Sequence, residues 1–179
     1  VLKQNGHRLR AMELKDLDLL HAWENASEDW WMGATLAPMS REAMRRFVTG
    51  DHDLYRDRQL RWMLDVQRDD TWTTVGAIDL YDFDPRHLRA GVAIFILEAF
   101  RRSHHGTLGL QIMKSYANQH LGLHQLYAEI PARHDASTRL FQGVGFSESS
   151  VRKQWIRDGQ GEWRDVVTWQ CMFQKPEAS

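Results

Sequence analysis

Apolar residues in the first hundred positions recur alternately at strand-like and helix-like intervals. Their spacing predicts a strand over His7–Met12 and a helix over Lys15–Asn25. Ser40 precedes a second predicted helix, Arg41–Val48, and its hydroxyl is suited to cap the first turn. Three predicted strands follow, Leu60–Gln67, Thr73–Tyr81 and Gly91–Leu97.

The connection between the first two of these strands is the polar run Arg68-Asp69-Asp70, which indicates a hairpin turn. The third strand is nearly all apolar, which is typical of a strand buried on both faces. In the second half of the chain the pattern predicts helix, strand, helix and a closing hairpin around Asp158-Gly159. The ranges are Gly106–His120, Gln125–Ile130, Asp135–Val144, Phe146–Trp155 and Glu162–Gln174.

The predicted order of elements is that of a mixed α/β domain. The 179 residues contain no internal repeat, low-complexity tract or linker, so we expect residues 1–179 to form a single domain. The 23 basic and 24 acidic residues nearly cancel, which argues against nucleic acid as a partner and favours a small molecule. The lone Cys171 lies in an apolar run, which favours an inert core position in a reducing cytoplasm. We expect no membrane partner, because no run reaches the roughly 18 apolar residues of a span.

The run from Phe100 to Met113 is a basic turn, rich in small residues, between an apolar strand and a helix. The first turn of a helix leaves backbone N–H groups unpaired at the positive end of the helix dipole, and Arg101 and Arg102 add positive charge beside them. Such a turn can hold a pyrophosphate. The alternative is an ordinary strand-to-helix turn on a basic surface.

Three stretches of the chain resemble the GNAT acyltransferase superfamily, in particular the branch of the spermidine and ribosomal-protein N-terminal acetyltransferases. They are Val-Gly-Ala-Ile-Asp-Leu-Tyr-Asp-Phe-Asp at 75–84, the strand, turn and helix at 91–117, and the segment from Leu-Gly-Leu-His-Gln-Leu-Tyr-Ala-Glu-Ile through Phe-Gln-Gly-Val-Gly-Phe at 121–146. The resemblance implies an α+β fold with a mixed, mostly antiparallel, twisted sheet of about seven strands. It also implies helices on both faces and a splayed central pair of strands.

The resemblance further implies acetyl-coenzyme A as donor and a primary amine as acceptor. The pantetheine arm of the donor would lie along a splayed strand at Ala93, Ile94, Phe95 and Ile96, pairing with free backbone groups. Its pyrophosphate would meet the family's Q/R-x-x-G-x-G/A turn, here Arg101, Arg102, Ser103, His104, His105 and Gly106, followed by Thr107. His104 replaces the usual first glycine, and its Cβ would crowd the backbone if the position is left-handed.

Two further positions differ from the family and bear on catalysis. His134 stands where the family often has an asparagine that holds the pantetheine, and Phe141 stands where a tyrosine usually protonates the departing thiolate. Phenylalanine has no proton to give, but a thiolate whose conjugate acid has a pKa near 8.5 is an adequate leaving group without an acid catalyst. Water or His134 are the alternatives as proton donor.

A proton acceptor for the attacking amine is expected among the acidic and histidine side chains of the strands. The candidates are Asp79, Asp82, His87 and Glu129, of which we favour Asp79 and Glu129 together with His134. For each of them the alternative is a solvated or salt-bridged side chain. The acceptor itself could meet an acidic and aromatic group formed by Glu24, Glu28, Asp29, Trp30 and Trp31 with Asp79, Asp82 and Asp84. The alternative here is a solvated acidic face with Trp23 packing the first helix.

Other chemistries lack their motifs. The chain contains neither G-x-G-x-x-G nor G-x-x-x-x-G-K-[ST], and its nine histidines include the adjacent pair His104-His105 but no zinc-binding pattern, so we expect no metal. Two hypotheses remain. The first is an N-acetyltransferase acting on a polyamine-like or amino-sugar amine or a peptide N-terminus, in a chain that could form homo-oligomers as its relatives often do. The second is a non-catalytic relative, either a coenzyme A sensor or a partner-binding module.

Overall fold

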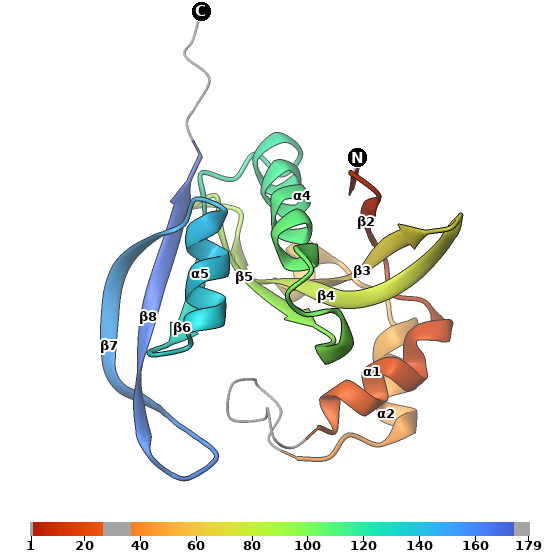
Figure 1. Cartoon of the computed structure of the whole chain (residues 1–179), viewed down its shortest axis with the longest axis horizontal. Helices are drawn as coiled ribbons and strands as arrows, with labels where there is room; N and C mark the ends of the chain where they lie inside the picture. The colour runs from red at the N-terminus through yellow and green to blue at the C-terminus, as the bar shows by residue number, and fades with distance from the viewer. Residues whose placement is uncertain (1, 27–36, 174–179) are drawn as a thin grey trace, which may run out of the picture.

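The computed structural model describes residues 2–26 and 37–173 and has an α+β architecture built on one eight-stranded sheet (Figure 1). The strand order is β1-β2-β3-β4-β5-β6-β8-β7, antiparallel throughout except for the parallel pair β5–β6. The strands are β1 Lys3–Gln4, β2 His7–Arg10, β3 Leu60–Arg68, β4 Thr71–Asp84, β5 Arg89–Ile96, β6 Gln125–Pro131, β7 Ser147–Arg157 and β8 Trp163–Met172. Seven of them were predicted, and the eighth, β1, is only two residues long.

Five α-helices accompany the sheet in the described part of the chain. They are α1 Leu17–Glu24, α2 Arg41–Thr49, α3 Leu54–Asp57, α4 His105–Gln119 and α5 Asp135–Gly143. Ser40 caps α2 as predicted, since its hydroxyl accepts a hydrogen bond from the Ala43 amide at 3.1 Å. The four-residue α3 was not predicted, because one turn is too short to show a helical apolar period.

The helices cover both faces of the sheet, as the family resemblance implied. Helices α1 and α2 pack on one face, where Leu20 and Met44 contact the sheet residues Met63 and Ala77. Helices α4 and α5 pack on the other face, over a larger core. That core includes Leu64, Ile78, Val92, Leu110, Met113, Leu126, Phe141 and the buried Cys171.

The central parallel pair of strands separates after three residue pairs. Arg89, Ala90 and Gly91 of β5 pair with Gln125, Leu126 and Tyr127 of β6, and beyond them β5 pairs only with β4 on its other side. Strand β6 meanwhile continues along β8 to Pro131. The divergence leaves one backbone edge of β5 unpaired and forms a fork in the sheet.

The fork corrects one prediction about β5. The residues Ala90, Gly91 and Val92 are buried as predicted, but Ala93 is exposed and Ile94, Phe95 and Ile96 are half-buried. Burial on both faces requires neighbours along the whole strand, and β6 is a neighbour only as far as Gly91.

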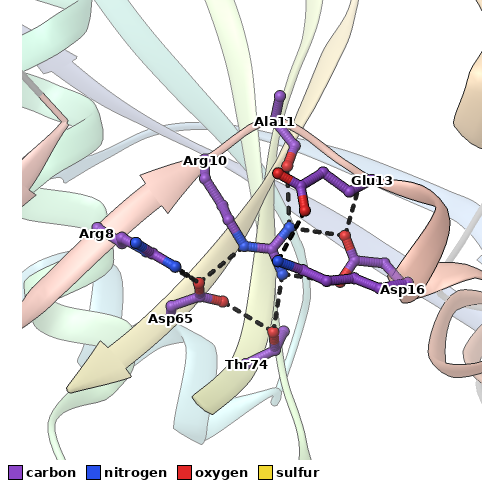
Figure 2. Close-up of polar contacts among 8 residues, drawn as sticks. Arg8, Arg10, Ala11, Glu13, Asp16, Asp65 and Thr74 are labelled. Atoms are coloured by element: carbon purple, nitrogen blue, oxygen red, sulfur yellow. Dashed lines mark hydrogen bonds and ion pairs between the residues drawn. The ribbon is translucent and has the colours of Figure 1, made fainter. Parts of the chain in front are cut away.

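Strand β2 is joined to its neighbours by a buried network of charged groups (Figure 2). Arg10 donates to Asp16 through both terminal nitrogens at 2.7 and 2.8 Å, and to Asp65 through Nε at 2.8 Å. Its remaining hydrogen bonds go to the Ala11 carbonyl and the Thr74 hydroxyl, so all five N–H groups have acceptors. Arg8 also donates to Asp65. Because Asp16 and Asp65 are 3% and 2% exposed, this network links β2, β3, β4 and the turn before α1 away from water.

Candidate active site

The turn between β5 and α4 presents backbone amides without partners. The first helical hydrogen bond of α4 runs from the Leu108 amide to the His104 carbonyl at 3.1 Å. The amides of His105, Gly106 and Thr107 precede it and have no acceptor among the residues described. Arg102 and His104 are left-handed, with φ of 62° and 58°, while Ser103 between them is not. Left-handed residues in such a turn can direct successive N–H groups toward one point, as an anion-binding site requires.

The conformation of His104 answers the question raised by the missing glycine. The position is left-handed, and the histidine adopts that conformation at a cost of about 1 kcal/mol. Its side chain is exposed, as are those of Arg101, Arg102 and Ser103, so the turn is open to solvent. Three cationic or titratable side chains therefore surround the free amides.

His105 contributes to the turn only through its backbone. Its side chain is 7% exposed and points into the protein, where Nδ1 lies 2.8 Å from Nε2 of His7. His7 Nδ1 contacts the Asn5 carbonyl at 2.8 Å and must donate to it, so His105 Nδ1 donates to His7 and His105 Nε2 is left without a partner in the described part of the chain. Burial and the positive charges nearby, including that of Arg68, lower the pKa of His105.

The unpaired edge of β5 connects this turn to the fork. Five residues, Val92 to Ile96, follow the last paired residue to the end of the strand, a span of roughly 17 Å at the usual rise per residue. Phe95 lies on the α1 face of the sheet, where Trp23 packs against it with ring centroids 4.9 Å apart. An extended ligand anchored at the turn can thus follow the edge to the fork and be covered partly by α1.

Two tyrosines lie at the fork on the same face. Tyr81, Gly91 and Tyr127 are paired side by side across β4, β5 and β6. The Tyr81 ring lies directly over Gly91, and a Cβ added to Gly91 would come within 2.3 Å of that ring. The centroids of the Tyr81 and Tyr127 rings are 5.7 Å apart. Tyr127 Oη donates to Asp82 at 3.2 Å. Burial and the Asp82 charge raise the pKa of Tyr127 to about 12, so its phenol remains a proton-bearing donor at neutral pH.

A pocket of about 670 Å³ opens beside these tyrosines, and we call it the fork pocket. Its lining includes Asp82, Tyr127, Glu129, Gln170, Arg58 and Arg89. Glu129 projects from β6 just beyond the fork and forms an ion pair with Arg152 of β7. Two of the predicted proton acceptors, Asp82 and Glu129, therefore line one pocket, with Glu129 beyond the fork and Asp82 toward the Arg89 end.

Asp79 lies outside the fork pocket. Both of its oxygens accept hydrogen bonds from Arg61, at 2.7 and 2.8 Å, and Arg61 also contacts Glu24 at 2.6 Å. Both carboxylate oxygens are therefore engaged by one guanidinium and are not free to meet an incoming amine. Glu24 belongs to this ion-pair cluster and is not merely solvated, whereas Glu28, Asp29, Trp30 and Trp31 lie outside the described residues. His87 is exposed in the turn after β4.

The matches to known proteins identify the family. A family model described as an acetyltransferase (GNAT) domain matches residues 7–147, most of the chain. The chain belongs to the GNAT acetyltransferase family.

Solved structures share the whole fold with this GNAT chain at low identity. The spermidine N-acetyltransferase of Vibrio cholerae with CoA and spermine is 17% identical, with a TM-score of 0.78 over 94% of this chain and 96% of that one. A dodecameric form of the Vibrio cholerae enzyme is 18% identical, with a TM-score of 0.75 over 94% and 95%. RimL, a ribosomal L7/L12 α-N-protein acetyltransferase, is 17% identical, with a TM-score of 0.77 over 95% and 92%. No curated protein matches the sequence significantly.

The two family positions that differ have defined surroundings in this GNAT domain. His134 precedes α5, and its Nδ1 accepts a hydrogen bond from the Ser137 amide at 3.3 Å, so it caps the helix as an asparagine would. Phe141 is 4% exposed and packs edge-on against Phe146 at 5.1 Å. Both side chains therefore contribute to α5, His134 as its cap and Phe141 through its packing.

Two general properties concern the described residues as a whole. None of their helices is both long and apolar enough to cross a bilayer. Within residues 2–26 and 37–173, no three histidine, cysteine, aspartate or glutamate side chains come together as metal ligands would.

Proposed function

We propose that this protein is an N-acetyltransferase that transfers the acetyl group of acetyl-coenzyme A to a primary amine. The observation that carries the proposal is the continuity of three features. Unpartnered amides at the start of α4 lead into the unpaired edge of β5, and that edge ends beside the fork pocket. A diphosphate, an extended diamide arm and a terminal thioester have the chemistry to meet these features in that order.

The coenzyme would be held mainly by the backbone. Amides at 102–107 and the side chains of Arg101 and Arg102 would bind the diphosphate, and Ala93, Ile94, Phe95 and Ile96 would pair with the arm. His134 and Phe141 would lie along the other side of the fork. The bound thioester supplies an electrophilic carbonyl carbon and a thiolate leaving group.

The chain's own groups would manage the proton and the position of the amine. Glu129, just beyond the fork, would hold the ammonium form in the fork pocket and accept its proton, directly or through water, before nitrogen attacks the carbonyl carbon. As the new C–N bond forms and the C–S bond breaks, a free amide of β5 is suited to stabilise the developing oxyanion. Tyr127 lies at the fork and carries a phenol proton, so it can donate a hydrogen bond to the departing sulfur.

A thiol-release assay tests the activity. The rate at which acetyl-coenzyme A releases free thiol should exceed the rate without amine for at least one compound in a panel of polyamines, amino sugars, amino acids and peptides. Calorimetry tests the binding mode separately. Arg101→Ala with Arg102→Ala should weaken coenzyme A binding about tenfold, as expected for two exposed charge-assisted contacts, and leave pantetheine binding unchanged. Arg46→Ala on the exposed surface of α2 is the matched control.

A second candidate function is a coenzyme A-binding protein without catalysis. The buried Phe141 and the Arg61-bound Asp79 favour it, because both withhold groups that acetyl transfer could use. Coenzyme A binding without amine-dependent thiol release would support this candidate. Absence of both binding and release would exclude the two candidates together.

Self-association belongs to the proposal as well. Strand β7 forms one edge of the sheet, none of its eleven residues is buried, and the hairpin with β8 exposes Trp155 and Trp163 by 55% and 57%. An exposed edge strand in a hairpin with exposed aromatic side chains offers a surface for a second copy. Light scattering should give a mass of two chains or more. We also place the protein in a reducing cytoplasm, with which the buried, free Cys171 agrees.

A further inference from the structure

The phenol of Tyr81 lies over the apex of the fork. Gly91 is the last residue of β5 that pairs with β6. A Cβ added to Gly91 would come within 2.3 Å of Tyr81 Cζ, the ring carbon that carries the hydroxyl. The hydroxyl is therefore one bond away from a carbon that lies against the backbone where the two strands separate. A glycine at this position leaves room for the ring.

The same face of β5 has an opening next to the Tyr81 ring. Alternate residues of the strand point to this face, and Gly91 is covered by Tyr81 while Phe95 is covered by Trp23, with ring centroids 4.9 Å apart. Ala93 lies between them, about 7 Å along the strand from Gly91, and is exposed. Two aromatic covers thus border an opening over Ala93. A thioester at the end of an arm paired with β5 would lie at this opening.

The hydroxyl of Tyr81 is the free one of the two phenols at the fork. Tyr127 Oη donates its proton to Asp82 at 3.2 Å, whereas Tyr81 Oη has no hydrogen-bond partner in the described part of the chain. Burial and the neighbouring Tyr127 and Asp82 raise the pKa of Tyr81, so its hydroxyl keeps its proton at neutral and moderately alkaline pH. Tyr81 is half-buried, and its proton is available to a ligand in the fork.

The other face of the sheet brings no phenol to the fork at Phe141. This residue belongs to the core under α4 and α5 and packs edge-on against Phe146. Tyr81 approaches the fork from the opposite face, the one that α1 covers. Because the strands are apart beyond Gly91, a sulfur atom lying between them is accessible from either face.

From this placement we infer that Tyr81 is a catalytic residue, whose hydroxyl donates a hydrogen bond to the thioester sulfur as it leaves. The inference rests on the proposed function and deepens it. The amine nitrogen forms its bond to the carbonyl carbon, the C–S bond breaks, and its electron pair goes to sulfur. The phenol keeps its proton, because a thiolate whose conjugate acid has a pKa near 8.5 is too weak a base to remove it. The thiolate takes its proton from water after leaving.

Kinetics of Tyr81→Phe test the role, because this variant loses only the hydroxyl. With the amine that gives the fastest release, kcat should fall about tenfold to a hundredfold, the usual loss of one hydrogen bond to a charged group. The KM for acetyl-coenzyme A should stay within about twofold, since the sulfur gains its charge only during the reaction. Tyr127→Phe should lower kcat by less. Tyr55→Phe, on the exposed surface of α3, is the matched control and should leave kcat unchanged.

Titration of the bound coenzyme A thiol tests the contact with sulfur without any amine. The ultraviolet absorbance of the thiolate reports its ionisation in the complex. A hydrogen bond to the thiolate favours the charged form, so the pKa of the bound thiol should be about one unit lower in the wild type than in Tyr81→Phe. Tyr55→Phe should give the wild-type value.

The outcomes separate the inference from the proposed function. If Tyr81→Phe leaves kcat unchanged, or if Tyr127→Phe lowers kcat more, the inference is wrong while the acetyltransferase stands. A lower kcat with an unchanged pKa of the bound thiol would place the hydrogen bond on the acyl oxygen and would also overturn the inference. If the wild type releases no thiol with any amine, the proposed function fails, and the catalytic role of Tyr81 fails with it.

Discussion

Replacing Arg10 by methionine should destabilise the protein far more than its place on a short N-terminal strand suggests. The side chain is 12% exposed and uses all five of its N–H groups, four of them on the side chains of Asp16, Asp65 and Thr74. Methionine fills a similar volume but supplies neither charge nor donors. The variant therefore leaves two buried carboxylates without their shared cation.

The magnitude follows from what each carboxylate retains. Asp65 keeps Arg8 and the Thr74 hydroxyl, whereas Asp16 keeps only the Glu13 amide at 2.9 Å. Removing one partner of a buried ion pair typically costs about 3–5 kcal/mol, because the remaining charge stays desolvated. We expect a loss at the lower end of that range, about 3 kcal/mol, since Asp65 is still paired.

Urea denaturation at pH 7 measures the loss directly, and Arg45→Met is the matched control. Arg45 also forms a bidentate pair, with Glu42, but both side chains are more than half exposed, so its replacement should have little measurable effect. Equal effects of the two substitutions would refute the reasoning, because Arg10 is largely buried and bonds two carboxylates, whereas Arg45 is exposed and bonds one.

The pH dependence gives an independent check. Burial alone would raise the pKa of Asp16, but the hydrogen bonds from Arg10 and the Glu13 amide outweigh it and lower the pKa below the ordinary 3.8. A lowered carboxyl pKa contributes stability that is present above the unfolded pKa and is lost as pH falls through the folded one. In Arg10→Met this contribution is absent, so the difference in unfolding free energy between the two proteins should shrink from pH 7 to pH 3.

Three further predictions concern the site. His104→Gly should raise the free energy of unfolding by about 0.5 kcal/mol by relieving left-handed strain, while His104→Ala, measured in the same denaturant series, should not. Phe141→Tyr should keep the fold but lower the free energy of unfolding by about 1 kcal/mol, because the added hydroxyl enters a position packed on Phe146. It should also raise kcat by supplying a proton donor. An unchanged kcat would mean that acid catalysis is absent or comes from another group. The pKa of His105 is lowered in the folded protein, so as pH falls below about 6.5 the unfolded chain binds this proton before the folded one does. The free energy of unfolding should therefore decrease with falling pH by at most about 1.4 kcal/mol per pH unit. His105→Phe should reduce this slope in the same denaturant series.

Local rules predicted the order of the elements because each element carries its own signal. Ser40 caps its helix through a neighbour three residues away, and the Arg68-Asp69-Asp70 turn closes its hairpin with left-handed φ of 43° and 61° at the two aspartates. Signals of this kind involve only a few consecutive residues. The fork is different: it followed from the family resemblance, because no periodicity shows where β5 loses its neighbour.

The contents of the site were harder to predict for the same reason. Tyr81 and Tyr127 are 46 positions apart and meet only through the register of β5, for which Gly91 within an apolar strand was the single sequence signal. For Asp79 the sequence left two possibilities, a free carboxylate and a salt-bridged one. The second is correct because Arg61 lies beside it on β3, and the sequence does not show that these two residues are neighbours. His105 was expected as part of the pyrophosphate turn, and nothing in the sequence indicated that its side chain pairs with His7, almost a hundred residues earlier.

The early parting of β5 from β6 also divides the molecule mechanically. Strands β1 to β5 form one blade and β6 to β8 another, and their shared seam is three residue pairs long, reinforced by helix packing. A ligand bound in the gap would contact both blades. Its binding should therefore slow amide hydrogen exchange in both blades together, whereas without the ligand each blade should open separately.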